Sequence, residues 1–249
     1  MDFGKAFSYI SEDESWSKKL GIGAVVFLVP ILNFAAFGFI LELIQNVWQG
    51  KERPLPAWDN FGNKLLDGLR FFAVVILYSL PMFILFGIFV AVFMGQLASY
   101  DYETAVNTSN YATSMEPLFF IGWAVMAMCL MPYYFFVLVM YPMFFIQLVR
   151  HRTVKSCFDF KEMWHIVRHN PGEYLIILGI MFGLYMASAI VTFPLYIVFL
   201  IPCIGFIIGM LVSGAMYMLI FFVFGHLAGQ FIRAFEPPEK PIDDALPAI

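Results

Sequence analysis

The chain has 249 residues, of which 61% are hydrophobic and only 13% are charged, and its formal net charge is −4. A soluble domain carries about a quarter charged residues, so this composition excludes an ordinary soluble protein and indicates an integral membrane protein. Because the net charge is negative, nucleic acid is not expected as a partner.

Four stretches lack Asp, Glu, Lys and Arg, namely residues 20–41, 71–100, 117–149 and 174–232. About 20 apolar residues cross a bilayer core of ~30 Å, so each stretch is long enough to span. The last stretch is long enough for two spans, with a turn near Pro194 and Pro202. We predict an all-α bundle of four transmembrane helices plus a proline-broken hydrophobic hairpin, or a fifth span, near the N-terminus.

This prediction divides the chain into three parts. Residues 1–19 form a cytoplasmic N-terminal segment, and residues 20–232 form a single helical membrane domain. Residues 233–249 form a Pro-rich, acidic tail that we expect to be disordered and cytoplasmic.

The first apolar stretch is interrupted by Pro30, with Asn33 three residues later. Each half is about ten residues long and covers about 15 Å, or half a bilayer. Lys residues before the stretch and after it both favour the cytoplasm. We prefer a re-entrant hairpin with its tip at residues 30–33; the alternative is a kinked span with the N-terminus outside.

The segment RPLPAWDNFG, residues 53–62, follows. Its two prolines favour extended backbone, Trp58 suits the headgroup level, and Asp59 or Asn60 suits a helix N-cap. Apolar residues then recur at helical spacing from Phe61 to Phe72, which predicts an amphipathic helix lying along the membrane surface.

Loop charges predict the orientation. Residues 101–116 contain acids and no Lys or Arg, whereas residues 147–173 contain five Lys or Arg. Because cationic loops stay on the cytoplasmic side, the first loop is expected outside and the second inside. The segment 53–62 and the C-terminus are then cytoplasmic.

A second surface helix is predicted within the cationic loop. Phe160 and Trp164 share one helical face, while Lys161 and Arg168 share another. Asp159 with Glu162 resembles a capping box. Such a helix suits anionic lipid headgroups.

Small residues recur every four positions in the last apolar stretch: Gly179, Gly183 and Ala187, then Gly205, Gly209 and Ser213, then Gly225 and Gly229. Such ridges let helix backbones approach closely. We expect them to pack the last two helices together.

Four segments together resemble a known family: WSKKLGIGAVVFLVPILNFAAFGF, NVWQGKERPLPAWDNFG, FDFKEMWHIVRHNPGEYL and GHLAGQ. They are similar to the domain-of-unknown-function family numbered 4013, membrane proteins of bacteria and archaea, over residues 15–232. The resemblance implies a multi-pass protein of the prokaryotic cytoplasmic (inner) membrane. It implies no activity and no catalytic residue.

Glu42 is the acid nearest the interior of an apolar stretch. An ionisable group within a span costs about 2.5–3.5 kcal/mol at the centre, so Glu42 with Asn33 could form a proton, ion or polar-substrate site. The other interpretation is a locally bonded or snorkelling acid. His226 lacks a partner ligand in the sequence, and no catalytic, metal or cofactor motif is present. The candidate binding residues are Asn33, Glu42, Trp58, Asp59, Trp164, Arg168 and His226.

We therefore expect a scaffold or accessory subunit without catalytic activity. Its partners are the lipid bilayer with its anionic headgroups and other membrane protein subunits or a homo-oligomer. The alternative is a small transporter or channel with a mid-membrane site near Glu42 and Asn33. An enzyme acting on lipid is least favoured, because no acid–base pair is visible.

Overall fold

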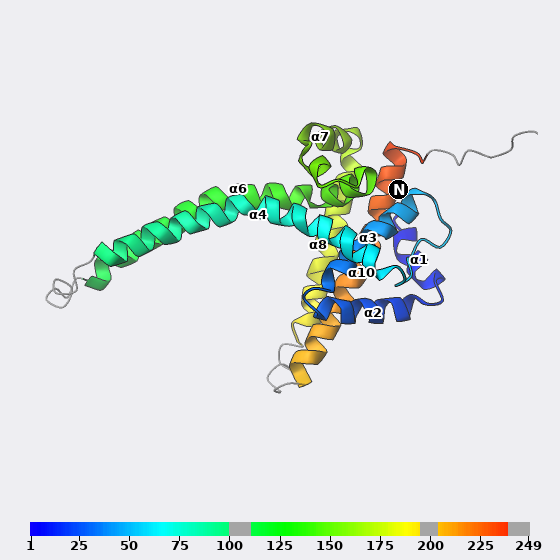
Figure 1. Cartoon of the computed structure of the whole chain (residues 1–249), viewed down its shortest axis with the longest axis horizontal. Coiled ribbons are helices and arrows are strands. Elements are labelled where there is room, and N and C mark those ends of the chain that lie inside the picture. Colours follow the sequence, from blue (N-terminus) through cyan, green and yellow to red (C-terminus); the bar gives the residue numbers. More distant parts are fainter. Residues whose placement is uncertain (100–110, 195–203, 239–249) are drawn as a thin grey trace, which may run out of the picture. The chain divides into compact units, whose positions relative to one another are not determined.

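The structure is a computed structural model that describes residues 1–99, 111–194 and 204–238, and every element in this part is helical (Figure 1). In chain order the elements are α1 (Lys5–Glu12), α2 (Trp16–Leu28), α3 (Asn33–Trp48), α4 (Phe61–Ser99), α6 (Tyr111–His151), the 3-10 helix η1 (Val154–Phe158), α7 (Phe160–His169), α8 (Pro171–Thr192) and α10 (Ile204–Phe235). Two compact units are present: unit 1 is Met1–Ala73 with Pro142–Ile249, and unit 2 is Val74–Tyr141.

Four helices are long and apolar enough to cross a membrane: Phe61–Gly95, Phe120–His151, Pro171–Thr192 and Ile207–Phe235. The predicted all-α fold with four spans is therefore confirmed, and the protein is a multi-pass membrane protein. α8 ends at Thr192 and α10 begins at Ile204, on either side of the expected turn. Residues 195–203 of that turn lie outside the described part of the chain. Residues 100–110, most of the loop predicted to be outside, also lie beyond it.

The first apolar stretch is broken where the sequence predicts. α2 ends at Leu28 and α3 begins at Asn33, so the residues around Pro30 separate two helices that contact each other. α3 continues to Trp48, beyond the apolar stretch, and its interior positions Phe39 and Leu43 are fully buried. The re-entrant position of this pair in a bilayer stays a prediction.

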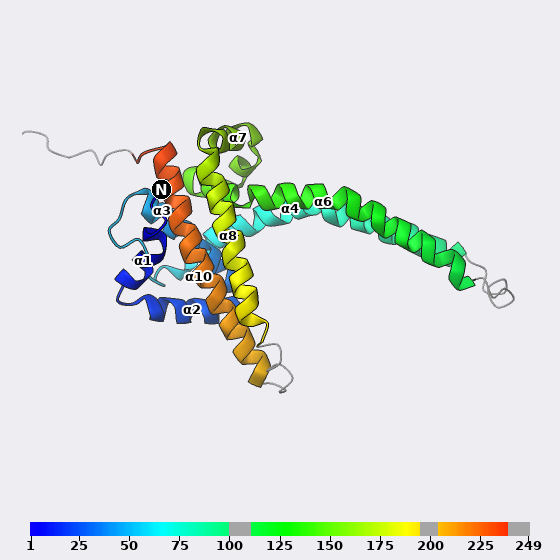
Figure 2. The ribbon, with the colours of Figure 1, turned by 180° about the vertical axis from the view of Figure 1, so that it is seen from behind.

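α10 is the central helix of unit 1. It packs against α2, α3 and α8, and α1 also contacts it (Figures 1 and 2). The buried face of α10 contributes large side chains, among them Phe222, Phe224 and Phe231. Burying aromatic side chains of this size is a major stabilising term, so α10 contributes strongly to the core, together with α3 and the end of α6.

The glycine ridges have a different partner from the one expected. Gly225 and Gly229 lie against Leu43 and Val47 of α3, with no room for a Cβ atom. The expectation that this ridge packs α10 on α8 was therefore wrong. The Gly179 ridge of α8 was also misjudged, because a Cβ there would meet nothing within 4 Å. Small residues allow close approach without specifying which helix approaches.

α3 and the first turns of α4 cross backbone to backbone. A Cβ on Gly38 would collide with the carbonyl oxygen of Lys64, and one on Gly68 would collide with that of Phe34. Only glycine permits so short a separation between two helices. This crossing places the beginning of α4 beside the C-terminal half of α3.

Unit 2 consists of two antiparallel helical segments, Val74–Ser99 of α4 and Tyr111–Tyr141 of α6, which lie side by side (Figures 1 and 2). The hydroxyl of Tyr133 donates to the carbonyl of Tyr78, and the Phe89 ring lies against Trp123. Two helices cannot bury each other's whole circumference. Many large apolar side chains, such as Phe83, therefore remain exposed.

The two predicted surface helices differ in outcome. Residues 160–169 form the separate helix α7, and Asp159 is confirmed as its N-cap because the Glu162 amide donates to its carboxylate at 3.0 Å. The Glu162 side chain pairs with Arg150, so the reciprocal half of a capping box is not seen. Residues 61–72 are helical too, but they are the first turns of α4, which continues without a break to Ser99.

The chain remains ordered past the predicted start of the tail. α10 runs to Phe235, and Glu236 still contacts the rest of unit 1. Residues 239–249, which contain most of the predicted tail, lie outside the described part. The single membrane domain over residues 20–232 stays a prediction, since the division into two compact units does not decide it.

Candidate functional site

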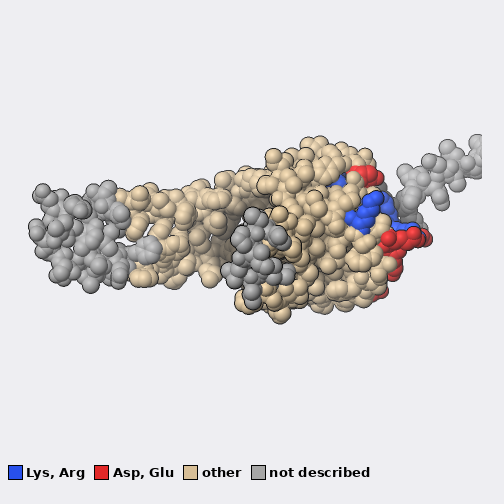
Figure 3. Space-filling view, turned by 90° about the horizontal axis from the view of Figure 1, so that it is seen from below, with Lys and Arg blue, Asp and Glu red and all other residues tan. Residues whose placement is uncertain are grey.

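Polar side chains gather at one end of unit 1, where α3, α6 and α10 terminate and α4 begins. Figure 3 shows charged side chains at one end of this unit, while the remaining described surface on that face is uncharged. We call this region the polar end; it comprises residues 42–51, 59–70, 147–152 and 226–236. It contains two cavities.

The first cavity has a volume of about 290 Å³ and lies between the end of α3, the beginning of α4 and the end of α6. We call it the Glu42 cavity. It is lined by Leu41, Glu42, Gln45, Asn46, Gln49, Lys51, Asn60, Asn63, Lys64, Asp67, Arg70, Leu148, Val149 and Arg152.

Lys64 is the most buried charge of this cavity, with 2% of its side chain exposed. Its ammonium lies 2.7 Å from a carboxylate oxygen of Glu42 and donates to the carbonyl of Asp59 at 2.9 Å. The Asp59 carboxylate is 3.5 Å away. Burying an ammonium is costly unless it is paired and hydrogen-bonded, and this arrangement meets both conditions. The Gly38–Gly68 crossing positions the two helices for it.

Two other cations of the cavity bind neutral groups. Lys51 donates to the side-chain oxygen of Asn46 at 2.7 Å, and Arg152 donates to that of Gln45. The Asn46 amide in turn donates to the carbonyl of Pro54 at 2.9 Å, which ties the extended segment to α3. The charges of Lys51 and Arg152 are thus not neutralised by any carboxylate among the ion pairs of the described residues.

The second cavity, of about 360 Å³, contains His226. The imidazole is buried and stacks on the Tyr9 ring at 4.4 Å. The Tyr9 hydroxyl donates to the carbonyl of Phe222 at 2.8 Å, and burial followed by the nearby Asp13 raises the pKa of Tyr9, so it remains a donor. Gln230 contacts the imidazole at 2.9 Å and exchanges two hydrogen bonds with the backbone of Asp2.

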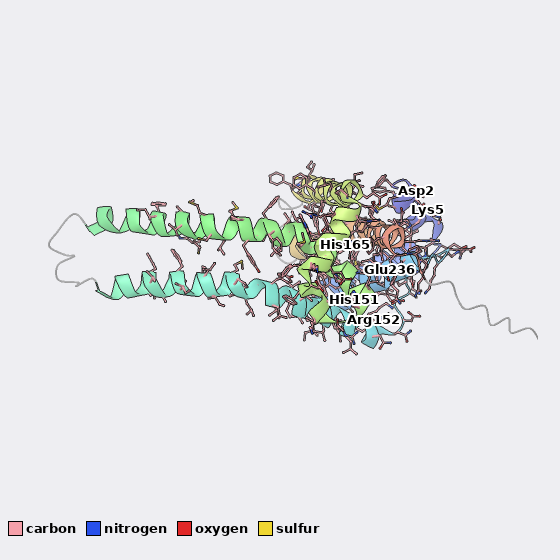
Figure 4. All side chains as sticks on the ribbon, turned by 90° about the horizontal axis from the view of Figure 1, so that it is seen from above. Asp2, Lys5, His151, Arg152, His165 and Glu236 are labelled. Carbon is pink, nitrogen blue, oxygen red and sulfur yellow. The ribbon has the colours of Figure 1, made fainter. Side chains whose placement is uncertain are left out.

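Arg150 joins the ends of three helices at the polar end. It pairs with Glu162 of α7 at 2.6 Å and with Glu236 after α10 at 2.7 Å. His151 also contacts Glu162 at 3.1 Å, and Figure 4 shows His151 and Glu236 at the same end. Partial burial favours a higher pKa for Glu162, but the bonds from Arg150 and His151 outweigh it and lower that pKa.

Cys157 lies in η1, between α6 and α7, and is fully buried. Its thiol contacts the carbonyl of Phe144 at 3.6 Å. Burial raises the pKa of Cys157 to about 12, so the thiolate is suppressed at neutral pH. We assign it a packing role.

The structure brings together only some of the predicted binding residues. Glu42 and Asp59 meet at Lys64, whereas Asn33 is at the opposite end of α3, about 14 Å away at helical rise. Its side-chain oxygen is buried without a hydrogen-bond partner. Trp58 stacks on Phe39 and donates to a backbone carbonyl of α2, so it anchors the extended segment.

The other predicted residues lie apart from the Glu42 cavity. Trp164 and Arg168 form an exposed pair on α7, with the guanidinium 5.2 Å from the indole centre. His226 lines the second cavity. Among the described residues, no group of three His, Cys, Asp or Glu side chains could hold a metal ion.

Sequence reasoning missed Lys51, Lys64 and Arg152 as members of one site. Each belongs to a different segment, and nothing in its spacing indicates the partner helix. The buried position of Lys64 had one indirect signal: Gly68 is one turn further along the helix, where a close approach needs a small residue.

Residues 22–197 match the family described as "Protein of unknown function (DUF4013)". No curated protein and no solved structure is significantly similar to the chain. The matched region includes the broken apolar stretch, the extended segment, both helices of unit 2, and α7 with α8. With well over half of its length matched, the chain belongs to the DUF4013 family.

Proposed function

We propose that this protein is an integral membrane scaffold or accessory subunit that binds a partner protein, another copy of itself or lipids through the polar end of unit 1 and the adjoining helix α7. It performs no catalysis in this proposal. One observation is the main support for this proposal. Polar side chains gather at one end of unit 1, whereas aromatic rings fill its core.

The aromatic packing begins next to the Glu42 cavity, at Phe71, which follows the lining residue Arg70. The rings of Phe71 and Phe145 are 4.1 Å apart, and those of Phe39 and Phe222 are 5.7 Å apart. A transported polar solute needs side chains along its path that replace its water. Of the buried polar residues in the described part of unit 1, Asn46, Lys64, Gln147 and His226 belong to the polar end, whereas Asp13, Ser188 and the buried side-chain oxygen of Asn33 lie outside it. The larger share at one end favours binding over transport.

α7 supports the same proposal from the outside of the unit. Its inner residues Met163 and Ile166 are buried, while Phe160 and Trp164 are about half exposed beside the cation Arg168. An exposed aromatic and cationic surface of this kind suits a lipid interface or a partner protein. Arg150 holds α7 against the ends of α6 and α10 through Glu162, so the surface is presented rigidly.

The polar end is assigned to the cytoplasmic side of a prokaryotic inner membrane, with the C-terminus on the same side. Cations retained in the cytoplasm set the topology of short loops, and this end includes the loop cations Lys51, Lys64, Arg70, Arg150 and Arg152.

Site-specific photo-crosslinking in native membranes tests the proposal. A photoreactive amino acid is placed at Trp164 of α7 and, as the control, at Phe83 of unit 2, which is similarly exposed. We expect a discrete protein adduct from position 164 and mainly lipid adducts from position 83.

Identical adduct patterns at the two positions would contradict the scaffold. The transporter alternative then has its own test, the flux of solutes into liposomes that contain the purified protein. A flux that Glu42→Gln abolishes, while Asp67→Asn preserves it, would replace our proposal with that alternative.

A further inference from the structure

The Glu42 cavity has an excess of positive charge. Its lining includes four cations, Lys51, Lys64, Arg70 and Arg152, and two carboxylates, Glu42 and Asp67. Lys64 is satisfied by Glu42, and Arg70 pairs with Asp67. The surplus therefore belongs to Lys51 and Arg152, whose partners are uncharged amide oxygens.

These two cations remain available to a ligand. Both are exposed, and both line the cavity together with the side-chain amides of Asn60 and Asn63. The amide oxygens that hold them are weaker partners than an anion, because an anion adds the attraction of a full negative charge that a neutral oxygen lacks. An anion in the cavity would gain both contacts without breaking an existing ion pair.

The start of α4 adds to the preference for an anion. Asn60, Asn63 and Lys64 belong to or adjoin the first turn of this long helix. A helix N-terminus carries a partial positive charge, which favours phosphate-like groups. The backbone amides of Asn63 and Lys64 already donate to the Asn60 carbonyl, so the helix contributes its dipole and the side-chain amides of Asn60 and Asn63. The cavity thus combines a helix start, two unneutralised cations and several amide donors.

We propose that the Glu42 cavity binds a phosphate group, presented either by the headgroup of an anionic membrane lipid or by a soluble phosphate ester. A volume of about 290 Å³ accommodates a phosphate with a small substituent such as glycerol. This inference rests on the proposed function, because it names the ligand class of the polar end. It can nevertheless fail while α7 still binds a partner.

A competing explanation for Lys51 and Arg152 is purely structural. Lys51 follows the end of α3 and Arg152 follows the end of α6, where a cation is stabilised by the helix dipole. This explanation requires no ligand. It predicts that replacing the two cations lowers stability slightly and leaves phosphate binding unchanged.

The experiment compares the full-length protein with two double variants in phosphatidylcholine nanodiscs. Lys51→Gln with Arg152→Gln removes the surplus charge of the cavity, and Lys18→Gln with Arg53→Gln removes one exposed lysine and one exposed arginine outside its lining. Phosphatidic acid in the nanodisc is the lipid probe and glycerol 3-phosphate is the soluble probe. Binding is measured by isothermal titration and by the rise in the unfolding temperature.

We expect the cavity variant to bind at least one probe about tenfold more weakly than the wild type, since two charge-assisted hydrogen bonds are lost. The control variant should bind that probe as the wild type does. Lipid binding without binding of the soluble ester assigns the headgroup as the source, and the reverse assigns a soluble ligand.

Equal binding by the wild type and both variants would overturn the proposal, and so would the absence of binding by the wild type. The unfolding temperature without any probe shows whether the variants are folded. Neither outcome bears on the crosslink at Trp164, so the two proposals fail separately.

Discussion

Units 1 and 2 are both helical and apolar, yet they use their side chains in opposite ways. In unit 1, α10 is surrounded by other helices and its Phe222 is fully buried. Unit 2 consists of two helical segments, and its Phe83 is 59% exposed. Composition alone therefore does not tell a protein core from a lipid-facing surface. The number of neighbouring helices decides it.

The polar residues follow the same division. Residues 74–99 and 117–141 contain no Asp, Glu, Lys or Arg, whereas unit 1 has buried ionic and hydrogen-bonded groups at one end. A charge in a helix pair surrounded by lipid has no partner to compensate its desolvation. A cluster of packed helix ends can supply several partners for a charge, as Glu42 and Asp59 do for Lys64.

The largest expected difference between the two units is in how they tolerate one added carbon atom on a glycine of α4. Gly68→Ala places a Cβ inside the backbone carbonyl of Phe34, and we expect this overlap to prevent unit 1 from folding. Gly87→Ala, in the unit 2 part of the same helix, meets nothing within 4 Å and should be neutral or slightly stabilising. Thermal unfolding in detergent, followed by circular dichroism, measures both. Equal tolerance of the two changes would refute the tight crossing.

A smaller loss is expected from truncating one aromatic ring. Phe222→Ala opens a cavity in the core of unit 1 and should cost about 3–5 kcal/mol. Phe83→Ala removes a ring from an exposed position and should cost less than ~1 kcal/mol in detergent. Hydrogen exchange resolved by peptide shows whether the loss is confined to unit 1. Similar losses for both variants would mean that Phe83 is covered in the purified protein.

The smallest expected effect is an acid dependence restricted to unit 1. Partial burial favours a higher pKa for Asp13, but hydrogen bonds from Lys19 and Ser15 outweigh this effect and lower the pKa. The pKa of Glu162 is lowered in the same way by Arg150 and His151. Both carboxylates therefore bind protons more readily in the unfolded chain. Their stabilisation is complete above their ordinary pKa values of 3.8 and 4.5 and is lost as the pH falls through the lower folded values.

Hydrogen exchange at a series of pH values, corrected for the intrinsic rate, measures this effect. Protection in unit 1 should fall below about pH 4.5, and Glu162→Gln should remove part of that fall. Peptides from residues 74–99 serve as the internal control, because this segment has no acid of its own. A profile for Glu162→Gln identical to that of the wild type would contradict the role of the Arg150–Glu162 pair.

Features within one segment could be predicted from the sequence. Hydrophobic length identified the four spans, Pro30 identified the break between α2 and α3, and Asp159 identified the start of α7. Each of these depends on residues within about one helix of each other, so local physics suffices.

Contacts between helices could not be predicted. Glu42 and Lys64 meet because Gly38 and Gly68 let α3 and α4 touch. Nothing in the sequence indicates that these two glycines belong to the same helix crossing. For the same reason the Gly225 ridge was paired with the wrong helix. Asn33 and Glu42 were grouped because both are polar within one apolar stretch, although helical rise alone places them well apart.

The burial of Cys157 has a practical consequence for mapping which side of the membrane each loop faces. Maleimides react with thiolates, and this thiol is enclosed and protonated at neutral pH. It should therefore stay unlabelled in intact cells and can remain in place as reporter cysteines are introduced. Cys129, which is exposed in unit 2, is the native position to replace first.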